Sequence, residues 1–159
     1  MKYSIRKMTP ADNSAMAHLA RYNLKNHDLD IPGTVYFDPV LDDLCAFYDA
    51  TGRGYYVLTD EADRVVGGIG FAEFPLFDNC AELQKLYLDD SVKGNGFGYQ
   101  LIEYVESRMR DAGYTTSYLE THINLKAAMH TYDKCGCTLI DRPKDVAHGA
   151  MTHFYIKTL

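Results

Sequence analysis

The chain has 159 residues, of which 47% are hydrophobic and 24% are charged, the composition of one globular domain with enough residues for a core. Its formal net charge of -6 argues against a nucleic-acid partner, because such proteins cluster Lys and Arg and this chain scatters its sixteen. No stretch approaches ~18 consecutive apolar residues, and the N-terminus lacks the apolar core of a signal peptide. We therefore expect a single cytoplasmic domain over residues 1–159, with neither a membrane segment nor a nucleic-acid partner.

The first half of the chain predicts a strand, two helices and a hairpin. Residues 3–7 alternate as a strand, and Thr9-Pro10-Ala11-Asp12 then supplies an N-cap, a proline at the first helical position and an acid at the third. The helix that follows runs to about residue 26, and a polar loop leads to a second short helix over about 38–48. Residues 54–60 and 64–74 are predicted to form an antiparallel hairpin.

The second half predicts a strand over 81–88, a helix over 96–112 closed by Gly113, a strand over 117–122, a helix from Asn124 to about residue 135 ended by Gly136, and strands over 138–141 and 151–157. A strand, helix and strand in succession require a crossover and hence a parallel pair, whereas the first half is antiparallel. We therefore predict an α/β fold of the α+β type, with a mixed central sheet of about six to seven strands flanked by helices in the order βααβββαβαββ.

A glycine-rich turn joins the strand over 81–88 to the helix that follows it. The turn reads Lys93-Gly94-Asn95-Gly96-Phe97-Gly98. Such a turn presents free backbone N–H groups and the positive end of a helix dipole, which together bind an anion such as a pyrophosphate. The sequence therefore predicts a phosphorylated cofactor at this turn.

A dinucleotide-binding oxidoreductase is one alternative, because it also places glycines between a strand and a helix. Glu120 follows Gly98 by 22 residues, a spacing that would suit the ribose carboxylate of that fold. However, its G-x-G-x-x-G fingerprint would start at Gly94 and require glycine or alanine where Tyr99 stands. The oxidoreductase interpretation is therefore disfavoured.

Three features of the chain resemble the GNAT N-acetyltransferases, which use acetyl-CoA. The family's cofactor turn begins with Gln or Arg, followed after two intervening residues by Gly and after one more by Gly or Ala. Here Lys93 stands at the first position. Many members carry a strand glutamate eleven positions earlier, where this chain has Glu82. In many members a later helix carries an Asn, two small residues, a Tyr and a closing Gly-aromatic pair. The corresponding residues here are Asn124, Ala127-Ala128, Tyr132 and Gly136-Cys137, and Cys137 stands where the family has an aromatic residue.

The resemblance implies a set of residues for the cofactor and two for the chemistry. The implied acetyl-CoA contacts are Leu86, Tyr87, Leu88, Lys93, Gly94, Asn95, Gly96, Phe97, Gly98, Tyr99, Asn124 and Ala127. Tyr132 is implied as the acid that faces the departing thiolate, and Glu82 is implied as the general base, acting directly or through a water.

Elementary chemistry explains why a base is needed and what Tyr132 could do. An alkyl amine with a pKa of ~10.4 is neutral in only about 0.04% of molecules at pH 7, and only the neutral amine can attack a thioester. Glu82 is the acidic residue placed to take that proton. Proton transfer from a phenol of pKa ~10 to the thiolate of a thiol of pKa ~8.5 is energetically unfavourable. Proton donation and simple hydrogen bonding by Tyr132 therefore both stay open.

The resemblance implies that the acceptor pocket is lined by the loop joining the first two helices, together with the third strand, the end of the fifth strand and the last hairpin. Its candidates here are Tyr36, Phe37, Glu120 and His122, and the same loop also offers the acids Asp28, Asp30 and Asp38. Acidic and aromatic groups suit a cation, so we expect direct transfer, in a ternary complex, to the primary amine of a small molecule or an amino-acid-like acceptor. The alternative is a sensor that binds acyl-CoA without turnover. The oligomeric state stays open, with a homodimer as one candidate.

Other conspicuous residues have structural interpretations. The four cysteines are expected to be free thiols, and Cys135 and Cys137 lack the second pair of a zinc module, so no metal is predicted. His122, His130, His148 and His153 show no paired spacing and are interpreted as surface or packing residues rather than bases. Gly67, Gly68 and Gly70 within a strand indicate a close backbone approach or a bulge.

Overall fold

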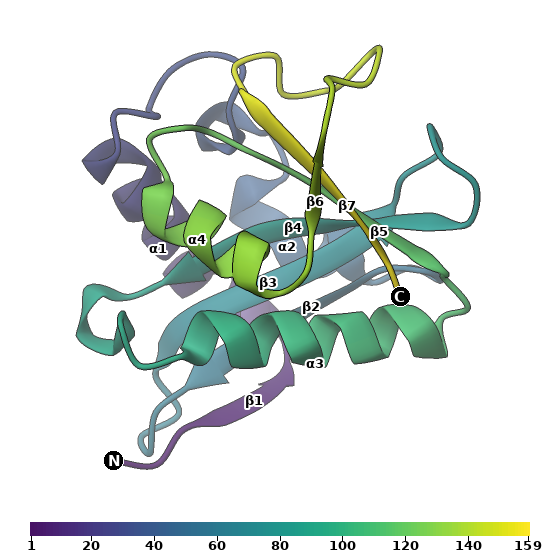
Figure 1. Ribbon diagram of the computed structural model, residues 1–159. Helices are drawn as coiled ribbons and strands as arrows, with labels where there is room; N and C mark the ends of the chain where they lie inside the picture. Colours follow the sequence, from purple (N-terminus) through teal and green to yellow (C-terminus); the bar gives the residue numbers. More distant parts are fainter.

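Seven strands form one mixed sheet in the order β1-β2-β3-β4-β5-β7-β6, as the computed structural model of residues 1–159 shows (Figure 1). The strands are β1 (Ser4–Lys7), β2 (Gly54–Thr59), β3 (Val65–Glu73), β4 (Cys80–Leu88), β5 (Thr116–Thr121), β6 (Thr138–Ile140) and β7 (His153–Thr158). The α-helices are α1 (Asn13–Asn26), α2 (Leu44–Tyr48), α3 (Phe97–Asp111) and α4 (Lys126–Lys134). The predicted order βααβββαβαββ and the mixed sheet are therefore confirmed.

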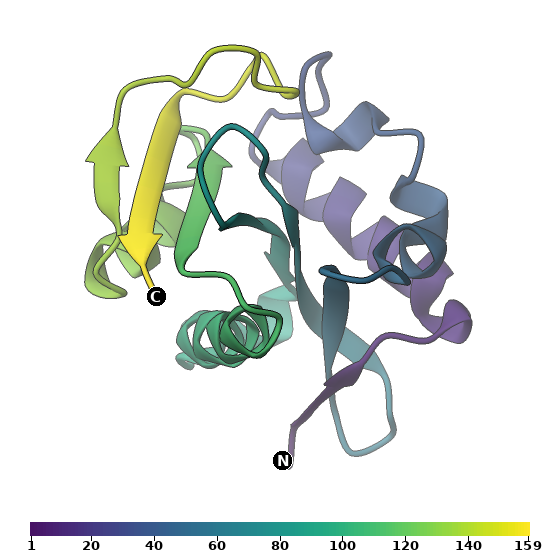
Figure 2. The same ribbon diagram turned by 90° about the vertical axis from the view of Figure 1, so that its right-hand side faces the viewer.

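The helices cover both faces of the sheet, with α1 and α2 on one side and α3 on the other (Figure 2). Each side has its own apolar cluster. Leu101, Val105 and Met109 of α3 are fully buried in one cluster, and Met16 and Ala20 of α1 are fully buried in the other. The apolar stripe predicted for α3 therefore forms the core beneath it. Burial of each large side chain there stabilises the fold by about 1.5–3 kcal/mol.

The strand pairing explains where the sheet opens. Strands β1 to β4 are antiparallel neighbours, and β5, β7 and β6 form a second antiparallel group. The two groups meet at β4 and β5, which run parallel and pair only through Cys80–Thr116, Ala81–Ser117 and Glu82–Tyr118. Beyond Glu82 the two strands have no further ladder, so the sheet splits there into two arms.

The glycines of β3 leave room for a side chain from the neighbouring strand β2. A Cβ on Gly68 would come within 2.7 Å of Tyr55, and a Cβ on Gly70 would come within 2.5 Å of the same ring. The register also shifts between Gly68 and Gly70, where β3 pairs with β4. The close approach predicted for these glycines is therefore present, and the bulge at this shift lies opposite them, in β4.

Two predicted helix starts differ from the structure. The second helix, expected to begin at about residue 38, begins only at Leu44 as α2, and the segment before it contains the short 3₁₀ turn Leu41–Asp43. Asn124 does not cap α4, whose N-cap is Leu125. Its side-chain Nδ2 instead donates to the backbone carbonyl of His27, at 2.9 Å, because a hydrogen bond across to the end of α1 is available there.

No helix in the structure is long and apolar enough to cross a bilayer. All four cysteines are free thiols, and no group of three or more His, Cys, Asp or Glu side chains is arranged to hold a metal ion.

Candidate active site

The turn before α3 has the features of an anion cradle. None of the backbone N–H groups from Gly94 to Tyr99 donates to a backbone carbonyl. Gly94 and Gly96 have φ values of 78° and 80°, and a Cβ on either would have no neighbour within 4 Å. The side chain of Asn95 turns inward and donates to the carbonyls of Val92 and Lys93. The open side of the turn is therefore lined by N–H groups, which suit a diphosphate.

A bulge in β4 shapes the opening between β4 and β5. Tyr87 pairs with Gly68 and Gln84 pairs with Gly70, so Lys85 and Leu86 oppose a single residue of β3. Lys85 takes a positive φ of 53° at this point, and the buried hydroxyl of Tyr55 fixes it by donating to its carbonyl at 2.7 Å. A bulge re-aims the strand that carries it. It lies beside a cavity where β4 has no β5 partner.

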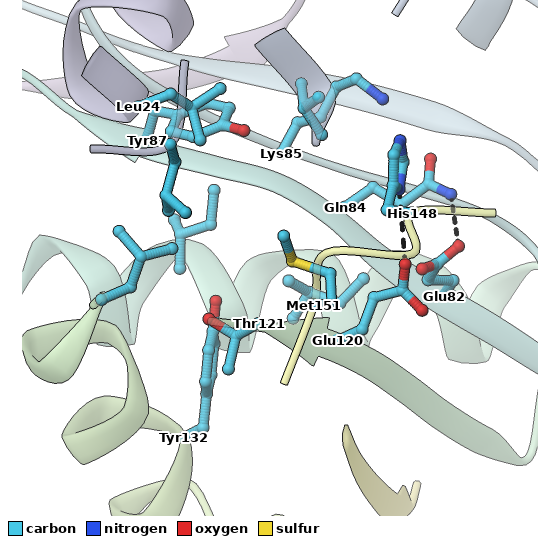
Figure 3. Close-up of a pocket in the computed structure, with 15 residues that line it drawn as sticks. Leu24, Glu82, Gln84, Lys85, Tyr87, Glu120, Thr121, Tyr132, His148 and Met151 are labelled. Carbon is cyan, nitrogen blue, oxygen red and sulfur yellow. Dashed lines mark hydrogen bonds and ion pairs between the residues drawn. The ribbon is translucent and has the colours of Figure 1, made fainter. Parts of the chain in front are cut away.

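We call this space the inner cavity, and it has a volume of about 80 Å³. Both arms of the sheet line it, together with α1, α4 and the loop between β6 and β7 (Figure 3). Its lining residues are Leu24, Leu29, Val35, Glu82, Leu83, Gln84, Lys85, Leu86, Tyr87, Glu120, Thr121, Leu125, Tyr132, His148 and Met151.

Glu82 stands at the point where β4 and β5 separate. Its Oε1 accepts a hydrogen bond from Gln84 Nε2 at 2.7 Å, and Gln84 Oε1 in turn accepts from the buried hydroxyl of Tyr48 at 2.7 Å. Burial, followed by the neighbouring Glu120 carboxylate, raises the pKa of Glu82 to about 7. The carboxylate is therefore a stronger base than an ordinary glutamate and is oriented by its neighbours.

A chain of ion pairs crosses from the loop after α1 to β5. Lys85 Nζ lies 3.4 Å from Asp38 Oδ2, His148 Nε2 lies 2.8 Å from Asp38 Oδ1, and His148 Nδ1 lies 3.4 Å from Glu120 Oε1. Its hydrogen bond to Asp38, and then its contact with the Glu120 carboxylate, raise the pKa of His148 to about 9. His148 is therefore a cation at neutral pH that joins two acids from distant segments.

Tyr132 projects from α4 into the inner cavity from the side opposite the ion pairs (Figure 3). Its ring is buried beside Tyr155, with 6.0 Å between ring centroids. Burial raises the pKa of this phenol above its ordinary value. The hydroxyl therefore keeps its proton and is available as a hydrogen-bond donor.

A second space, which we call the outer hollow, shares one wall with the inner cavity and has a volume of about 400 Å³. The shared wall consists of Glu82, Gln84, Lys85, Glu120 and His148. Its other lining residues are Asp38, Val40, Phe47, Glu73, Phe74, Pro75, Leu76, Asp145, Val146 and Ala147. The carboxylate of Glu82 therefore borders two spaces, as a base between two reactants would.

A sequence match to a family model identifies the family of this protein. The model of the acetyltransferase (GNAT) family matches residues 21–137, which is most of the chain. The protein is a GNAT acetyltransferase. The resemblance expected from the turn, Glu82 and the α4 residues is therefore confirmed at the level of the family.

Relatives of this acetyltransferase agree with that assignment. The chain is 33% identical over 139 residues to the uncharacterised N-acetyltransferase YjgM of Escherichia coli (strain K12), covering 86% of this chain and 83% of that one. A GNAT acetyltransferase of Staphylococcus aureus MU50 matches with a TM-score of 0.87 at 18% identity over 99% of each chain. The PaiA N-acetyltransferase of Thermoplasma acidophilum, solved with coenzyme A, matches with a TM-score of 0.77 at 19% identity over 100% of each chain. The solved structures support the fold.

The structure gathers some of the sequence-predicted site residues of this acetyltransferase and leaves others outside. Glu82, Glu120 and Tyr132 line the inner cavity together with Leu86 and Tyr87. The remaining candidates for the acceptor do not line either space. Tyr36 lies over the outer side of α1, Phe37 is 60% exposed, and His122 accepts a hydrogen bond from the backbone of Asn124.

Sequence reasoning missed several residues of the site. Tyr48, Gln84 and Lys85 carry no local motif, whereas Asp38, offered by the polar loop, does line the outer hollow. His148, interpreted as a surface or packing residue, is instead only 22% exposed at its side chain and is ion-paired to Asp38 and Glu120. Its partners are distant in the sequence, 110 residues away in the case of Asp38, so no spacing pattern could have found them.

Proposed function

We propose that the protein transfers the acetyl group of acetyl-CoA to the primary amine of a small molecule, by direct attack within a ternary complex. The observation that carries this proposal is Glu82, a half-buried carboxylate with a pKa raised to about 7 that borders both the inner cavity and the outer hollow. A base near neutral pKa between two spaces suits proton removal from one reactant while it meets another.

The residues present fit coenzyme A at the turn before α3. The free N–H groups from Gly94 to Tyr99 and the dipole of α3 would hold the diphosphate. Lys93 adds a positive charge there, although it is also paired with Asp90 at 2.8 Å. Leu86, Tyr87 and Leu88 would contribute backbone along β4, and Asn124 and Ala127 lie at the start of α4. When bound, acetyl-CoA supplies an acetyl thioester, an electrophile whose thiolate can leave.

Glu82 is the proposed general base. The acceptor would enter the outer hollow as an ammonium ion, which has no lone pair, and Glu82 would accept its proton directly or through a water. Glu82 can do so because its raised pKa narrows the gap to that of an alkyl ammonium, ~10.4. Gln84 and Tyr48 keep the carboxylate in place through the two hydrogen bonds of 2.7 Å.

The two other groups proposed for the chemistry act by hydrogen bonding. Beyond Glu82, β4 has no partner in β5, so backbone N–H groups between Leu86 and Leu88 can face the inner cavity and donate to a developing oxyanion. Tyr132 is proposed to donate a hydrogen bond to the departing sulfur rather than its proton, because burial raises its pKa.

The test is an acetyl-transfer assay that follows release of the coenzyme A thiol with a panel of amines. We expect acetyl-CoA-dependent thiol release with at least one class among polyamines, amino acids, aminoglycosides and peptide N-termini. Binding of acetyl-CoA without transfer to any of them would instead identify the chain as an acyl-CoA sensor.

A further inference from the structure

One oxygen of Glu120 is buried without a hydrogen bond. The side chain is 6% exposed. Its Oε2 accepts from the hydroxyl of Tyr118 at 2.9 Å, whereas Oε1 has no hydrogen-bond partner. The nearest cation, His148 Nδ1, lies 3.4 Å from Oε1, which is ion-pair contact. Buried carboxylate oxygens are normally satisfied, so this atom points to a donor supplied by a ligand.

The free oxygen lies where an acceptor would be bound. Glu120 and Glu82 both line the outer hollow and the inner cavity, and the close-up shows their carboxylates at the same end of the site (Figure 3). The two acids are near enough for Glu120 to raise the pKa of Glu82. A group with several N–H donors and a positive charge would satisfy both, and an ammonium ion carries three such donors.

The charges around the outer hollow favour one class of amine over another. Its lining includes the carboxylates of Asp38, Glu73, Glu82, Glu120 and Asp145, but only two cations, Lys85 and His148. Both cations are already ion-paired with Asp38. A carboxylate on the acceptor, as in an amino acid, would therefore find no free positive partner and would face several negative charges.

A second positive charge on the acceptor would, in contrast, find a partner. Glu73 is held by Arg53 at 2.5 Å, but Asp145 at the exposed rim forms no ion pair with any residue of the chain. The volume of about 400 Å³ leaves room for an aliphatic chain between the buried pair of acids and the rim.

We infer that the acceptor is an aliphatic di- or polyamine without a carboxylate, whose reacting ammonium binds between Glu82 and Glu120 Oε1 and whose second ammonium faces Asp145. This inference rests on the proposed function and narrows it, because it selects plain amines over amino acids. Glu120 is then a specificity-determining residue.

The sharpest test compares 1,4-diaminobutane with ornithine, which differ by one carboxylate. Calorimetric titration in the presence of coenzyme A measures binding separately from transfer. We expect the diamine to bind at least tenfold more tightly than ornithine, and 1-aminobutane to bind more weakly than the diamine. Equal or tighter binding of ornithine, or no binding of the diamine, would overturn the inference.

Transfer to the same compounds distinguishes this inference from the proposed function. Diamine binding with acetyl transfer supports both. Diamine binding without transfer supports the recognition of the amine and refutes the transferase. Transfer to ornithine in preference to the diamine supports the transferase and refutes the inference.

Three variants assign the recognition to named residues. Glu120→Gln should weaken diamine binding at least tenfold, whereas Glu103→Gln, which removes the same charge from the exposed face of α3, should leave it unchanged. Asp145→Asn lies at the exposed rim, where folding is insensitive to it, and should reduce the preference for the diamine over 1-aminobutane at least threefold. Unchanged binding in Glu120→Gln, or an unchanged preference in Asp145→Asn, would contradict the assignment.

Discussion

Glu82 shows how the surroundings of one side chain turn an ordinary acid into a base suited to neutral pH. In water a glutamate has a pKa of ~4.3, and a carboxylate with that pKa is a weak base toward an ammonium ion. Burial and the Glu120 carboxylate raise the pKa to about 7, while the Gln84 hydrogen bond acts in the opposite direction. The same factors that make Glu82 a better base also make its ionised form costly to bury.

Replacing Glu82 with Gln should abolish base function. We expect kcat at pH 7 to fall by about 10²-fold or more, the usual contribution of a general base. The loss should shrink at high pH, where more of the amine is neutral without assistance. Initial rates measured from pH 6 to pH 10 test this expectation, and a loss of the same size at every pH would indicate a structural role.

The same variant should be more stable than the native protein above neutral pH. A raised carboxyl pKa means that the folded state binds the proton more tightly than the unfolded state, so stability falls as pH rises from about 4.5 through about 7. Glu82→Gln removes that penalty. Melting temperatures should therefore be higher for the variant at pH 8 and nearly equal at pH 4, and a lower melting temperature at pH 8 would contradict the assigned pKa direction.

Replacing Tyr132 with Phe distinguishes its two candidate roles. A neutral hydrogen bond contributes about 0.5–1.5 kcal/mol, so kcat should fall about 2- to 10-fold, with coenzyme A affinity unchanged. A loss of about 10²-fold would identify Tyr132 as a proton donor. An unchanged kcat would limit it to packing against Tyr155.

His148 should make stability fall at alkaline pH. Its folded-state pKa is raised to about 9 by Asp38 and Glu120, so its contribution is fully present below ~6.5 and is lost as pH rises through about 9. At pH 6 we expect His148→Gln to lower the melting temperature by several degrees. The difference from the native protein should shrink by pH 9.5, and a pH-independent difference would refute a charged histidine.

The geometry of strand β4 depends on its two neighbours. On one side, the glycines of β3 let the ring of Tyr55 lie against the strand, and the Tyr55 hydroxyl reaches the carbonyl of Lys85 at the bulge. On the other side, pairing with β5 stops at Glu82. The bulge and the split in the sheet therefore place the polar side chains of β4 beside a cavity.

Adding a methyl group to β3 should disturb this arrangement. Gly70→Ala would place a Cβ 2.5 Å from Tyr55 Cδ2 and 3.0 Å from the carbonyl of Gly54, an overpacking that costs about 1–3 kcal/mol. For a chain of this length that corresponds to a fall in melting temperature of roughly 2–12 °C. Gly149→Ala, whose Cβ would have no neighbour within 4 Å, is the matched control and should change little.

The molecule as a whole combines two arms of sheet that each bring half of the site. The arm from β1 to β4 supplies Glu82 and the bulge, and the arm from β5 to β7 supplies Glu120 and, through its loop, His148. The ion pairs of Asp38 with Lys85 and His148 connect the arms across the opening. Ligands that bind across this opening should therefore stabilise the entire fold.

Coenzyme A should raise the melting temperature of the native protein. At 100 times the dissociation constant, a ligand specific for the folded state adds about 2.7 kcal/mol, or roughly 5–11 °C here. Gly96→Val should abolish that rise, because Gly96 has a φ of 80° and its absent side chain leaves the cradle open. Gly149→Val, which lies outside the cradle, is the control. A full ligand-induced rise in Gly96→Val would contradict the cofactor placement.

The order of the elements, the mixed sheet, the glycine turn and the family could all be predicted from the sequence, because each depends on residues close together in the chain. The apolar stripe of α3 and the glycines of β3 are examples. Helix starts were less predictable, as Asn124 shows, because a distant hydrogen bond to His27 competes with capping.

Only the tertiary structure could assign the environment of the acids. Glu82 is surrounded by Gln84, Tyr48 and Glu120, and Glu120 meets His148, which Asp38 also holds. These residues come from separate strands and loops, and burial, which sets the pKa of Glu82, is a property of the packed molecule. A local pattern can show that an acid is present, but its charge state, and whether each of its oxygens accepts a hydrogen bond, depend on what folding brings beside it.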